Sequence, residues 1–235
     1  LRGAKVMVSA RSADKLKALS AKMTQGVDQA LDVTQRESVQ AAFDRLLQLW
    51  GGVDLIVLMA GTYSEMSVTQ FDLQAVRQQI EVNLTGSMNV LDVVLPHLTA
   101  SKQGHVSIVS SVAGYRGLPN SLAYGPSKAA LINLSEALYV ELKAFDVGVS
   151  VVNPGFVDTP LTRQNTFPMP FLITAEKAAE EMITGYERGE FEIHFPKAFT
   201  RTLRTLRILP YSLYFKAVSR IARKTNPPEA LNSSK

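Results

Sequence analysis

Short apolar segments alternate with longer segments of helical pattern along most of this 235-residue chain. The short segments are rich in Val, Ile, Leu and Ala, which is typical of strands buried in a sheet. We expect strands over residues 4–10, 27–33, 53–59, 105–110, 147–152 and 191–195. We expect helices over residues 13–23, 37–50, 71–98, 122–145 and 175–188. This alternation predicts a parallel sheet, because parallel neighbours are joined by crossover connections.

The expected strands are apolar on both faces, as residues 53–59 illustrate, so helices must cover both sides of the sheet. The chain therefore predicts a doubly wound parallel α/β sheet in three α/β/α layers. Its length and its 46% hydrophobic content are those of a single globular domain. Ligands of such sheets bind beyond the carboxyl ends of the strands, which is where we look for functional residues.

Three polar residues follow the strand expected at 105–110. Ser111 comes directly after it, Tyr124 lies thirteen residues further on, and Lys128 follows after four more. The spacing of four places Tyr124 and Lys128 on one helix face. An ammonium group there favours the phenolate and brings a pKa of about 10 closer to the working range. Pro126 is tolerated only in a first helical turn, so Tyr124 is expected near the N-terminus of its helix.

A second Tyr-x-x-x-Lys pair, Tyr139 and Lys143, shows that such a pair alone carries little information. It lies about four turns further along the same expected helix, and no strand end is near it. The residue thirteen positions before Tyr139 is Pro126 instead of a serine. We interpret this second pair as surface and packing.

The composition excludes several kinds of site. The chain contains no cysteine, so it has neither disulfides nor thiolate zinc sites, and this fits a reducing, cytoplasmic compartment. Its three histidines, His97, His105 and His194, show no ligand spacing, so we expect no metal site. No apolar run approaches the roughly 18 residues that span a bilayer. We also expect no nucleic-acid partner.

Five motifs at strand ends make residues 1–196 resemble the short-chain dehydrogenase/reductase family, whose fold is Rossmann-like. Ser111, Tyr124 and Lys128 match the family's catalytic core. Asn83, in Val-Asn-Leu-Thr-Gly, is similar to its catalytic asparagine. Besides Tyr124 and Lys128, the residues that the resemblance implies for cofactor binding are Asp32, Val33, Ala60, Gly61, Pro154, Gly155, Val157 and Thr159.

The chain departs from the family pattern in two places. Leu58 and Met59 stand where the family has paired asparagines, which removes side-chain hydrogen bonds that steady the neighbouring strands. The family also opens with a strand and a glycine-rich turn that holds the pyrophosphate, whereas residues 1–4 resemble the end of the helix after that turn. We therefore expect about 25 further residues upstream of Leu1, carrying this strand and turn.

Arg11 is expected to decide the choice of cofactor. In dinucleotide-binding sheets an acid at the end of this strand accepts hydrogen bonds from a free ribose 2′-hydroxyl, whereas an arginine accommodates a 2′-phosphate. The strand here ends in Val-Ser-Ala-Arg-Ser, with an arginine and no acid. The resemblance therefore implies NADP(H) in preference to NAD(H), the alternative being that Arg11 is an ordinary surface residue.

The resemblance implies an oxidoreductase that interconverts a carbonyl and an alcohol by hydride transfer. Tyr124 would be the general acid or base, and Ser111 would hydrogen-bond the substrate oxygen. Lys128 would lower the pKa of the tyrosine, and Asn83 would position a water of a proton relay. Two variable segments, residues 114–121 and 161–173, would form the substrate pocket, and the aromatic residues of the second favour an apolar substrate.

Two other classes of function stay open. One is a non-catalytic binding protein or inactive fragment with the same fold. The other is an extended-type epimerase or dehydratase, which shares the Tyr-x-x-x-Lys pair but lacks the Pro-Gly-x-Val-x-Thr loop at residues 154–159.

Residues 197–235 form a basic amphipathic extension. They contain nine basic residues and one acid, so the net charge of +4 arises from a positive tail on a negative body. Arginines recur at every third position from 201 to 207, and a second basic and aromatic stretch follows Pro210. Such a segment is typical either of peripheral contact with an anionic membrane or of packing on the body or on a subunit of a homodimer or homotetramer.

Overall fold

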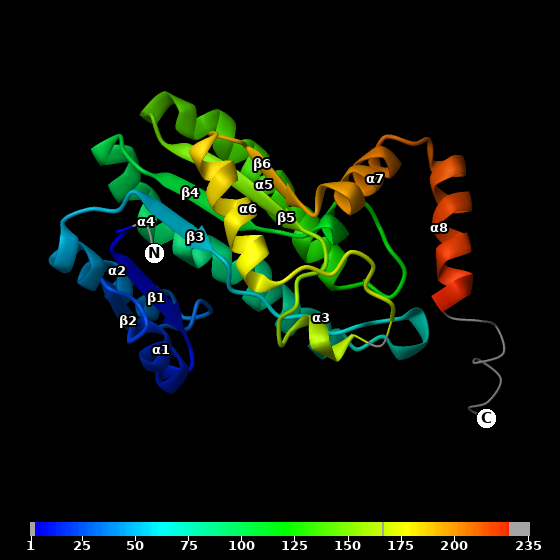
Figure 1. The fold of residues 1–235 in the computed structure, drawn as a ribbon, viewed down its shortest axis with the longest axis horizontal. Helices are drawn as coiled ribbons and strands as arrows, with labels where there is room; N and C mark the ends of the chain where they lie inside the picture. Colours follow the sequence, from blue (N-terminus) through cyan, green and yellow to red (C-terminus); the bar gives the residue numbers. More distant parts are fainter. Residues whose placement is uncertain (1–2, 166, 226–235) are drawn as a thin grey trace.

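A computed structural model of the chain describes residues 3–165 and 167–225, and the expected alternation of strands and helices is present in it (Figure 1). The strands are β1 (Val6–Ala10), β2 (Gly26–Ala30), β3 (Leu55–Leu58), β4 (His105–Val109), β5 (Gly148–Pro154) and β6 (Glu192–Phe195). The helices among them are α1 (Ala13–Ser20), α2 (Arg36–Trp50), α3 (Leu73–Ile80), α4 (Gly86–Ser101), α5 (Tyr124–Leu142) and α6 (Ala175–Glu187). Helices α7 (Lys197–Arg207) and α8 (Tyr211–Thr225) follow β6.

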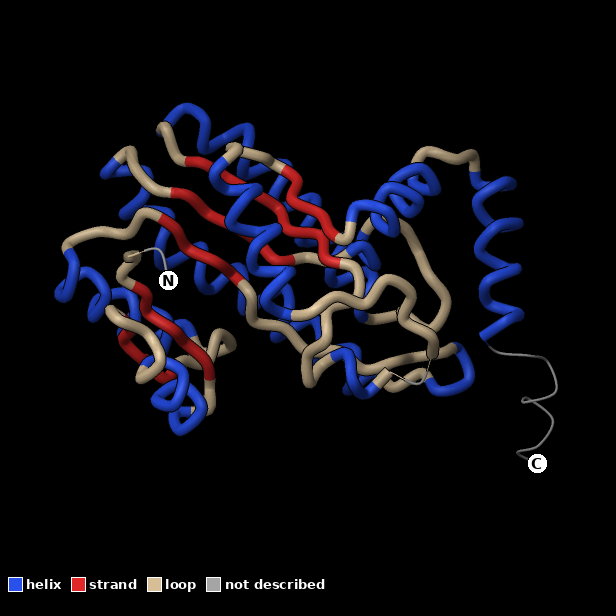
Figure 2. Tube along the Cα trace, in the orientation of Figure 1, coloured by secondary structure: helices blue, strands red, loops and turns tan. Residues whose placement is uncertain are grey.

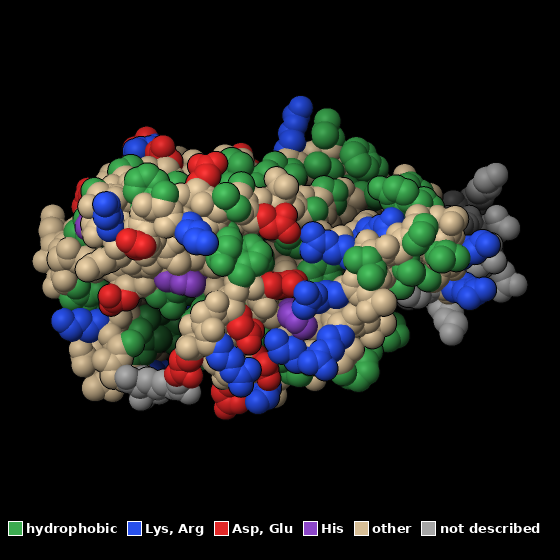
Figure 3. Space-filling model, turned by 90° about the horizontal axis from the view of Figure 1, so that it is seen from above, with side chains coloured by type: hydrophobic (Ala, Val, Ile, Leu, Met, Phe, Trp, Pro, Cys, Tyr) green, Lys and Arg blue, Asp and Glu red, His purple; other side chains and the backbone are tan. Residues whose placement is uncertain are grey.

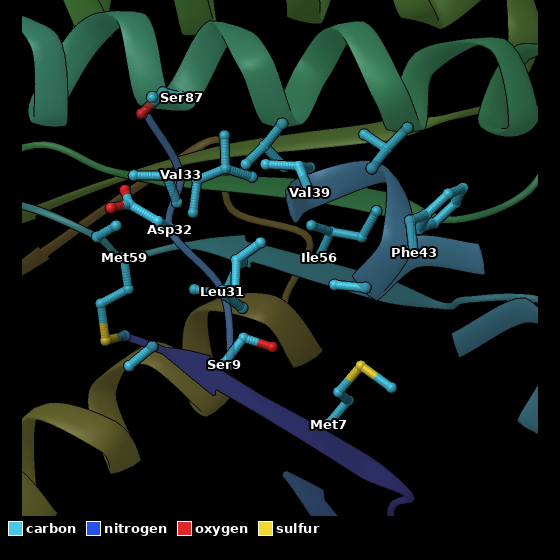
Figure 4. Close-up of a pocket in the computed structure, with 18 of the residues that line it drawn as sticks. Met7, Ser9, Leu31, Asp32, Val33, Val39, Phe43, Ile56, Met59 and Ser87 are labelled. Carbon is cyan, nitrogen blue, oxygen red and sulfur yellow. The ribbon is translucent and has the colours of Figure 1, made fainter. Parts of the chain in front are cut away.

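Every strand pair is parallel, but the described strands form two sheets. β1 pairs with β2, and the second sheet has the order β3-β4-β5-β6. Residues of β1 and β3 line opposite sides of a cavity of ≈ 550 Å³, which we call the slot (Figure 4). β5 extends beyond the expected segment because Asn153 and Pro154 pair with His194 and Phe195 of β6. The fold is the expected doubly wound one, interrupted by the slot.

Helices cover both faces of the four-stranded sheet. The main core lies under α2, α4 and α5, and Leu98 of α4, Val106 and Ile108 of β4 are fully buried in it. A smaller cluster lies under α6, where Ala178 packs with Ile193 and neighbouring apolar residues. Each fully buried aliphatic side chain contributes about 1.5–3 kcal/mol relative to an exposed one. The two clusters fix the sheet and therefore the positions of its carboxyl ends.

The loops that follow the strands of the larger sheet gather at one end of the molecule (Figure 2). α5 begins at this end with Tyr124, and Pro126 lies in its first turn as the sequence predicts. The helix expected over residues 71–98 is divided by a π-helical turn, Glu81–Thr85, which separates α3 from α4. None of the helices within the described part of the chain is long and apolar enough to cross a membrane.

Candidate active site

Ser111, Tyr124 and Lys128 meet at the N-terminus of α5. Ser111 lies two residues after the end of β4, and its hydroxyl group hydrogen-bonds the Tyr124 phenol. The Lys128 ammonium nitrogen lies 5.7 Å from the centroid of the Tyr124 ring. It donates a hydrogen bond of 3.0 Å to the carbonyl oxygen of Val109, the last residue of β4. The end of one strand and the first turns of one helix therefore supply all three groups.

Burial controls the protonation of both ionisable groups of this cluster. It raises the pKa of the Tyr124 phenol above its ordinary value, and the hydrogen bond from Ser111 acts in the opposite direction. It also lowers the pKa of Lys128, which is 4% exposed, to about 8. The sequence predicts that Lys128 lowers the pKa of Tyr124, but in this structure burial is the dominant influence on the tyrosine. Lys128 can exchange protons near neutral pH.

Gly114 permits the close contact that brings Ser111 to α5. A Cβ atom on Gly114 would lie 2.7 Å from the carbonyl carbon of Lys128 and 2.8 Å from the amide nitrogen of Ala129. Both are backbone atoms, so a side chain at this position cannot be accommodated by a rotamer change. The Gly114 N–H also donates to the carbonyl oxygen of Ser111. Its proximity to α5 therefore helps to set the position of the serine.

Asn83 lies in the π-helical turn and is fully buried. Its Oδ1 accepts from the amide of Thr62 at 2.7 Å, and its Nδ2 donates to the Thr62 carbonyl and to the Ser127 hydroxyl, both at 3.0 Å. A π-helical turn is rare and often marks a functional position. The side chain joins the loop after β3 to α5, next to Lys128. Asn83 therefore lies where the helix expected over residues 71–98 is interrupted.

Tyr63 is a neighbour of Tyr124 that the sequence reasoning missed. The two rings are 5.0 Å apart and meet edge to face at 81°. Burial and the nearby carboxylate of Glu65 raise the pKa of Tyr63 to about 12, so its hydroxyl group stays protonated at neutral pH. The sequence offers no motif for it beyond its place two residues after Gly61.

Five predicted cofactor-binding residues line the slot between β1 and β3. They come from the ends of three strands, namely Arg11, Asp32, Val33, Ala60 and Gly61. Figure 4 shows Asp32 and Val33 beside the apolar walls formed by residues such as Leu31 and Ile56. A Cβ atom on Gly61 would lie 3.4 Å from Asn83 Oδ1 and 3.5 Å from Lys128 Nζ. The slot therefore adjoins the cluster around Tyr124.

Asp32 and Val33 have structural partners of their own. Asp32 accepts hydrogen bonds from the amide and the hydroxyl of Thr34, which lower the pKa of its carboxyl group. The Val33 carbonyl accepts from Asn89 of α4 at 2.9 Å. These contacts fix the loop after β2 against α4, and a role at the adenine stays a prediction.

The predicted nicotinamide-side residues follow β5. The amide of Gly155 donates to the Phe195 carbonyl at 2.7 Å, and a Cβ atom on Gly155 would lie 2.8 Å from the ring of Phe199. Val157 forms a bridge with Ile173, and the Thr159 amide donates to the hydroxyl of Thr162. The loop is thus well ordered by its own hydrogen bonds, and Gly155 allows α7 to approach it closely.

The residues around the slot fit a dinucleotide in part. The slot has apolar walls for an adenine ring, and it is also lined by Arg11, which follows β1, and by Gly61, which follows β3 and lies near Lys128. Within residues 3–165 and 167–225 no glycine-rich turn lies at this edge to hold a pyrophosphate. Leu58, which replaces a family asparagine, is 7% exposed and belongs to the main core.

Comparisons with known proteins agree with this geometry. A family model described as short chain dehydrogenase matches residues 1–168. An uncharacterized oxidoreductase of Myxococcus xanthus is 38% identical over 191 residues, which cover 81% of this chain and 76% of that protein. A short-chain dehydrogenase from Streptomyces avermitilis has a TM-score of 0.78 at 22% identity, covering 95% and 90% of the two chains. An alcohol dehydrogenase from the archaeon Thermococcus sibiricus, complexed with 5-hydroxy-NADP, has a TM-score of 0.71 at 23% identity, covering 80% and 84%.

Proposed function

Because this chain belongs to the short-chain dehydrogenase family of oxidoreductases, we propose that it interconverts a carbonyl group and an alcohol on an apolar substrate with NADP(H). The observation that carries the proposal is the cluster at the start of α5. There the Ser111 hydroxyl hydrogen-bonds the Tyr124 phenol, and the buried ammonium of Lys128 lies beside the same ring. A proton donor, an oxygen ligand and a proton reservoir are thus adjacent.

Tyr124 is the general acid for reduction and the general base for oxidation. In reduction its O–H bond breaks as the proton moves to the substrate oxygen, while the Ser111 hydroxyl stabilises the charge that develops there. When bound, the cofactor supplies the hydride in reduction and accepts it in oxidation. Lys128, with a pKa of about 8, returns a proton to the tyrosine near neutral pH. Asn83 holds the loop after β3 against α5, which positions the relay.

Arg11 supports NADP(H) over NAD(H). It follows β1, is exposed at the mouth of the slot, and a guanidinium there can pair with a phosphate dianion through two parallel hydrogen bonds. The neighbouring Asp32 has its carboxylate engaged by Thr34. The Thermococcus sibiricus neighbour, which was complexed with an NADP derivative, is consistent with this preference.

Aromatic side chains near the β5 loop favour an apolar substrate. Phe156 packs against Phe167 at 6.0 Å and against Phe199 at 5.4 Å, and Phe171 lies 6.2 Å from Phe199. Phe171 and Leu172 remain 60% and 44% exposed. When an apolar substrate covers such side chains, the apolar surface removed from water stabilises the complex by about 25 cal/mol per Å².

Tyr124→Phe provides the direct test, with Tyr139→Phe as its matched control. The first removes the proton donor and should lower kcat about a thousandfold at unchanged NADPH affinity. Tyr139 is 47% exposed and packs on Phe191, so its variant should retain wild-type kcat. The assay is NADPH oxidation with a panel of apolar ketones and aldehydes, alongside NADPH titration by fluorescence. Equal activity of the two variants would refute the assignment of Tyr124.

A further inference from the structure

Arg116 connects the C-terminal helices to the segment between Ser111 and Tyr124. Its Nη1 lies 3.1 Å, 3.2 Å and 2.6 Å from the carbonyl oxygens of Leu206, Arg207 and Leu209, respectively. These carbonyls belong to the C-terminal end of α7 and the turn after it, where a helix leaves its last carbonyls without intrahelical partners. A cation at this end also opposes the negative end of the helix dipole.

The same guanidinium lies over two aromatic rings of α8. Its central carbon is 4.1 Å from the ring centroid of Tyr214 and 4.6 Å from that of Tyr211. The Tyr214 hydroxyl donates to the carbonyl oxygen of Gly117, which lies next to Arg116. Tyr214 is only 2% exposed, although α8 extends away from the sheet in Figure 1. Arg116 is therefore the group where α7, α8 and the segment after β4 meet.

This junction lies close to the candidate active site. Val112 and Tyr115, both 7% exposed, belong to a core cluster against which Leu203 of α7 packs. The Tyr115 hydroxyl donates to Glu192 at 2.6 Å, and Arg204 of α7 forms an ion pair with the same carboxylate at 3.2 Å. α7 is thus held both by Arg116 and by β6, beside the residue that follows Ser111.

We propose that Arg116 is a positioning residue, which fixes residues 112–121 against α7 and α8 and thereby sets the substrate side of the site. The proposal rests on the proposed function for its kinetic consequence, because these residues join Ser111 to Tyr124. A lysine at position 116 would keep the positive charge, but it would lose the planar stacking on Tyr211 and Tyr214 and the several N–H donors of the guanidinium group. The C-terminal helices are then part of the catalytic architecture.

Hydrogen exchange of the full chain tests the structural half. In Arg116→Ala the amides of residues 211–220 and of residues 112–121 should both exchange about tenfold faster, because cation–π and charge-assisted bonds are lost together. Arg116→Lys should recover less than half of the protection. Tyr214→Phe, which keeps the aromatic packing, should give a smaller increase in the same two segments. Arg201→Ala, at an exposed position of α7, is the matched control and should change neither segment.

Steady-state kinetics test the functional half. Arg116→Ala should raise KM for the carbonyl substrate about tenfold at unchanged NADPH affinity, and Arg201→Ala should leave both unchanged. Faster exchange confined to residues 211–220, with unchanged protection of 112–121 and unchanged KM, would overturn the proposal. If the wild-type protein showed no turnover, the proposed function would fail, and the exchange of residues 112–121 would still decide the role of Arg116.

Discussion

Replacing Gly114 by alanine should displace Ser111 from Tyr124 and reduce turnover. A Cβ atom at this position would lie 2.7 Å from the carbonyl carbon of Lys128, whereas ordinary contacts begin at 3.4 Å, so the segment must retreat by about 0.7 Å. The obstructing atoms belong to the backbone of α5 and cannot rotate away. Because the Gly114 amide donates to the Ser111 carbonyl, the retreat is passed to the serine.

The structure gives a magnitude for both stability and activity. Overpacking of this kind costs about 1–3 kcal/mol, and for a chain of this length it should lower Tm by about 5 °C. A misplacement approaching 1 Å costs up to about a hundredfold in rate, so we expect kcat to fall by about ten- to a hundredfold. NADPH affinity should change little, because the slot is lined by other segments.

Gly117→Ala is the matched control, because a Cβ atom on Gly117 would meet nothing within 4 Å. The two variants add the same methyl group three residues apart in one segment. The assay combines kcat and KM for a carbonyl substrate with thermal unfolding followed by circular dichroism. Wild-type kcat in Gly114→Ala, or an equal loss in Gly117→Ala, would refute the steric argument.

Three further predictions concern charge. Arg11→Asp should lower the ratio of kcat/KM with NADPH to kcat/KM with NADH by about ten- to a hundredfold. An unchanged ratio would mean that Arg11 is an ordinary surface residue with no role in cofactor choice. Burial and the neighbouring Lys197 and Arg204 lower the pKa of His194 in the folded protein. The unfolded chain therefore binds the proton more tightly, and the free energy of unfolding should fall as the pH drops below about 6.5. Urea unfolding at pH 7 and pH 5 measures this, and His194→Gln, which keeps an acceptor for Arg204 but does not titrate, should show a shallower loss. Figure 3 shows basic side chains toward the end of the molecule that carries α7 and α8, and these helices should bind anionic vesicles at low salt. Each cation at the vesicle surface should contribute about 1 kcal/mol. Binding that does not change with salt, or equal binding to neutral vesicles, would contradict this prediction.

Local sequence patterns predicted much of the fold because they report local physical constraints. Pro126 placed the start of α5 within two residues, since a proline is excluded from later turns. The pattern predicted one helix over residues 71–98, and the π-helical turn that divides it at Asn83 was not predicted. The alternation of apolar and amphipathic segments predicted that the strands are parallel, as they are within each sheet.

The contacts that the sequence did not reveal are those between distant segments. Arg116 reaches residues about ninety positions later, and no spacing rule connects it with Leu209 or Tyr214. Residue 114 was predicted only as part of a substrate-pocket segment, and its close approach to the backbone of α5 was not predicted. The slot escaped notice because strand patterns predict that strands exist, and they do not predict that two neighbouring edges stay apart.

Two kinds of contact support the candidate active site. The groups proposed for proton transfer lie within short distances of each other and rest on the large buried core beneath α4 and α5. In our proposal the substrate side depends on α7 and α8, which are attached through a few polar and aromatic contacts at Arg116 and Glu192. Contacts of that kind open more readily than a close-packed core. Variation in the C-terminal helices should therefore alter substrate binding while it leaves the proton-transfer groups in place.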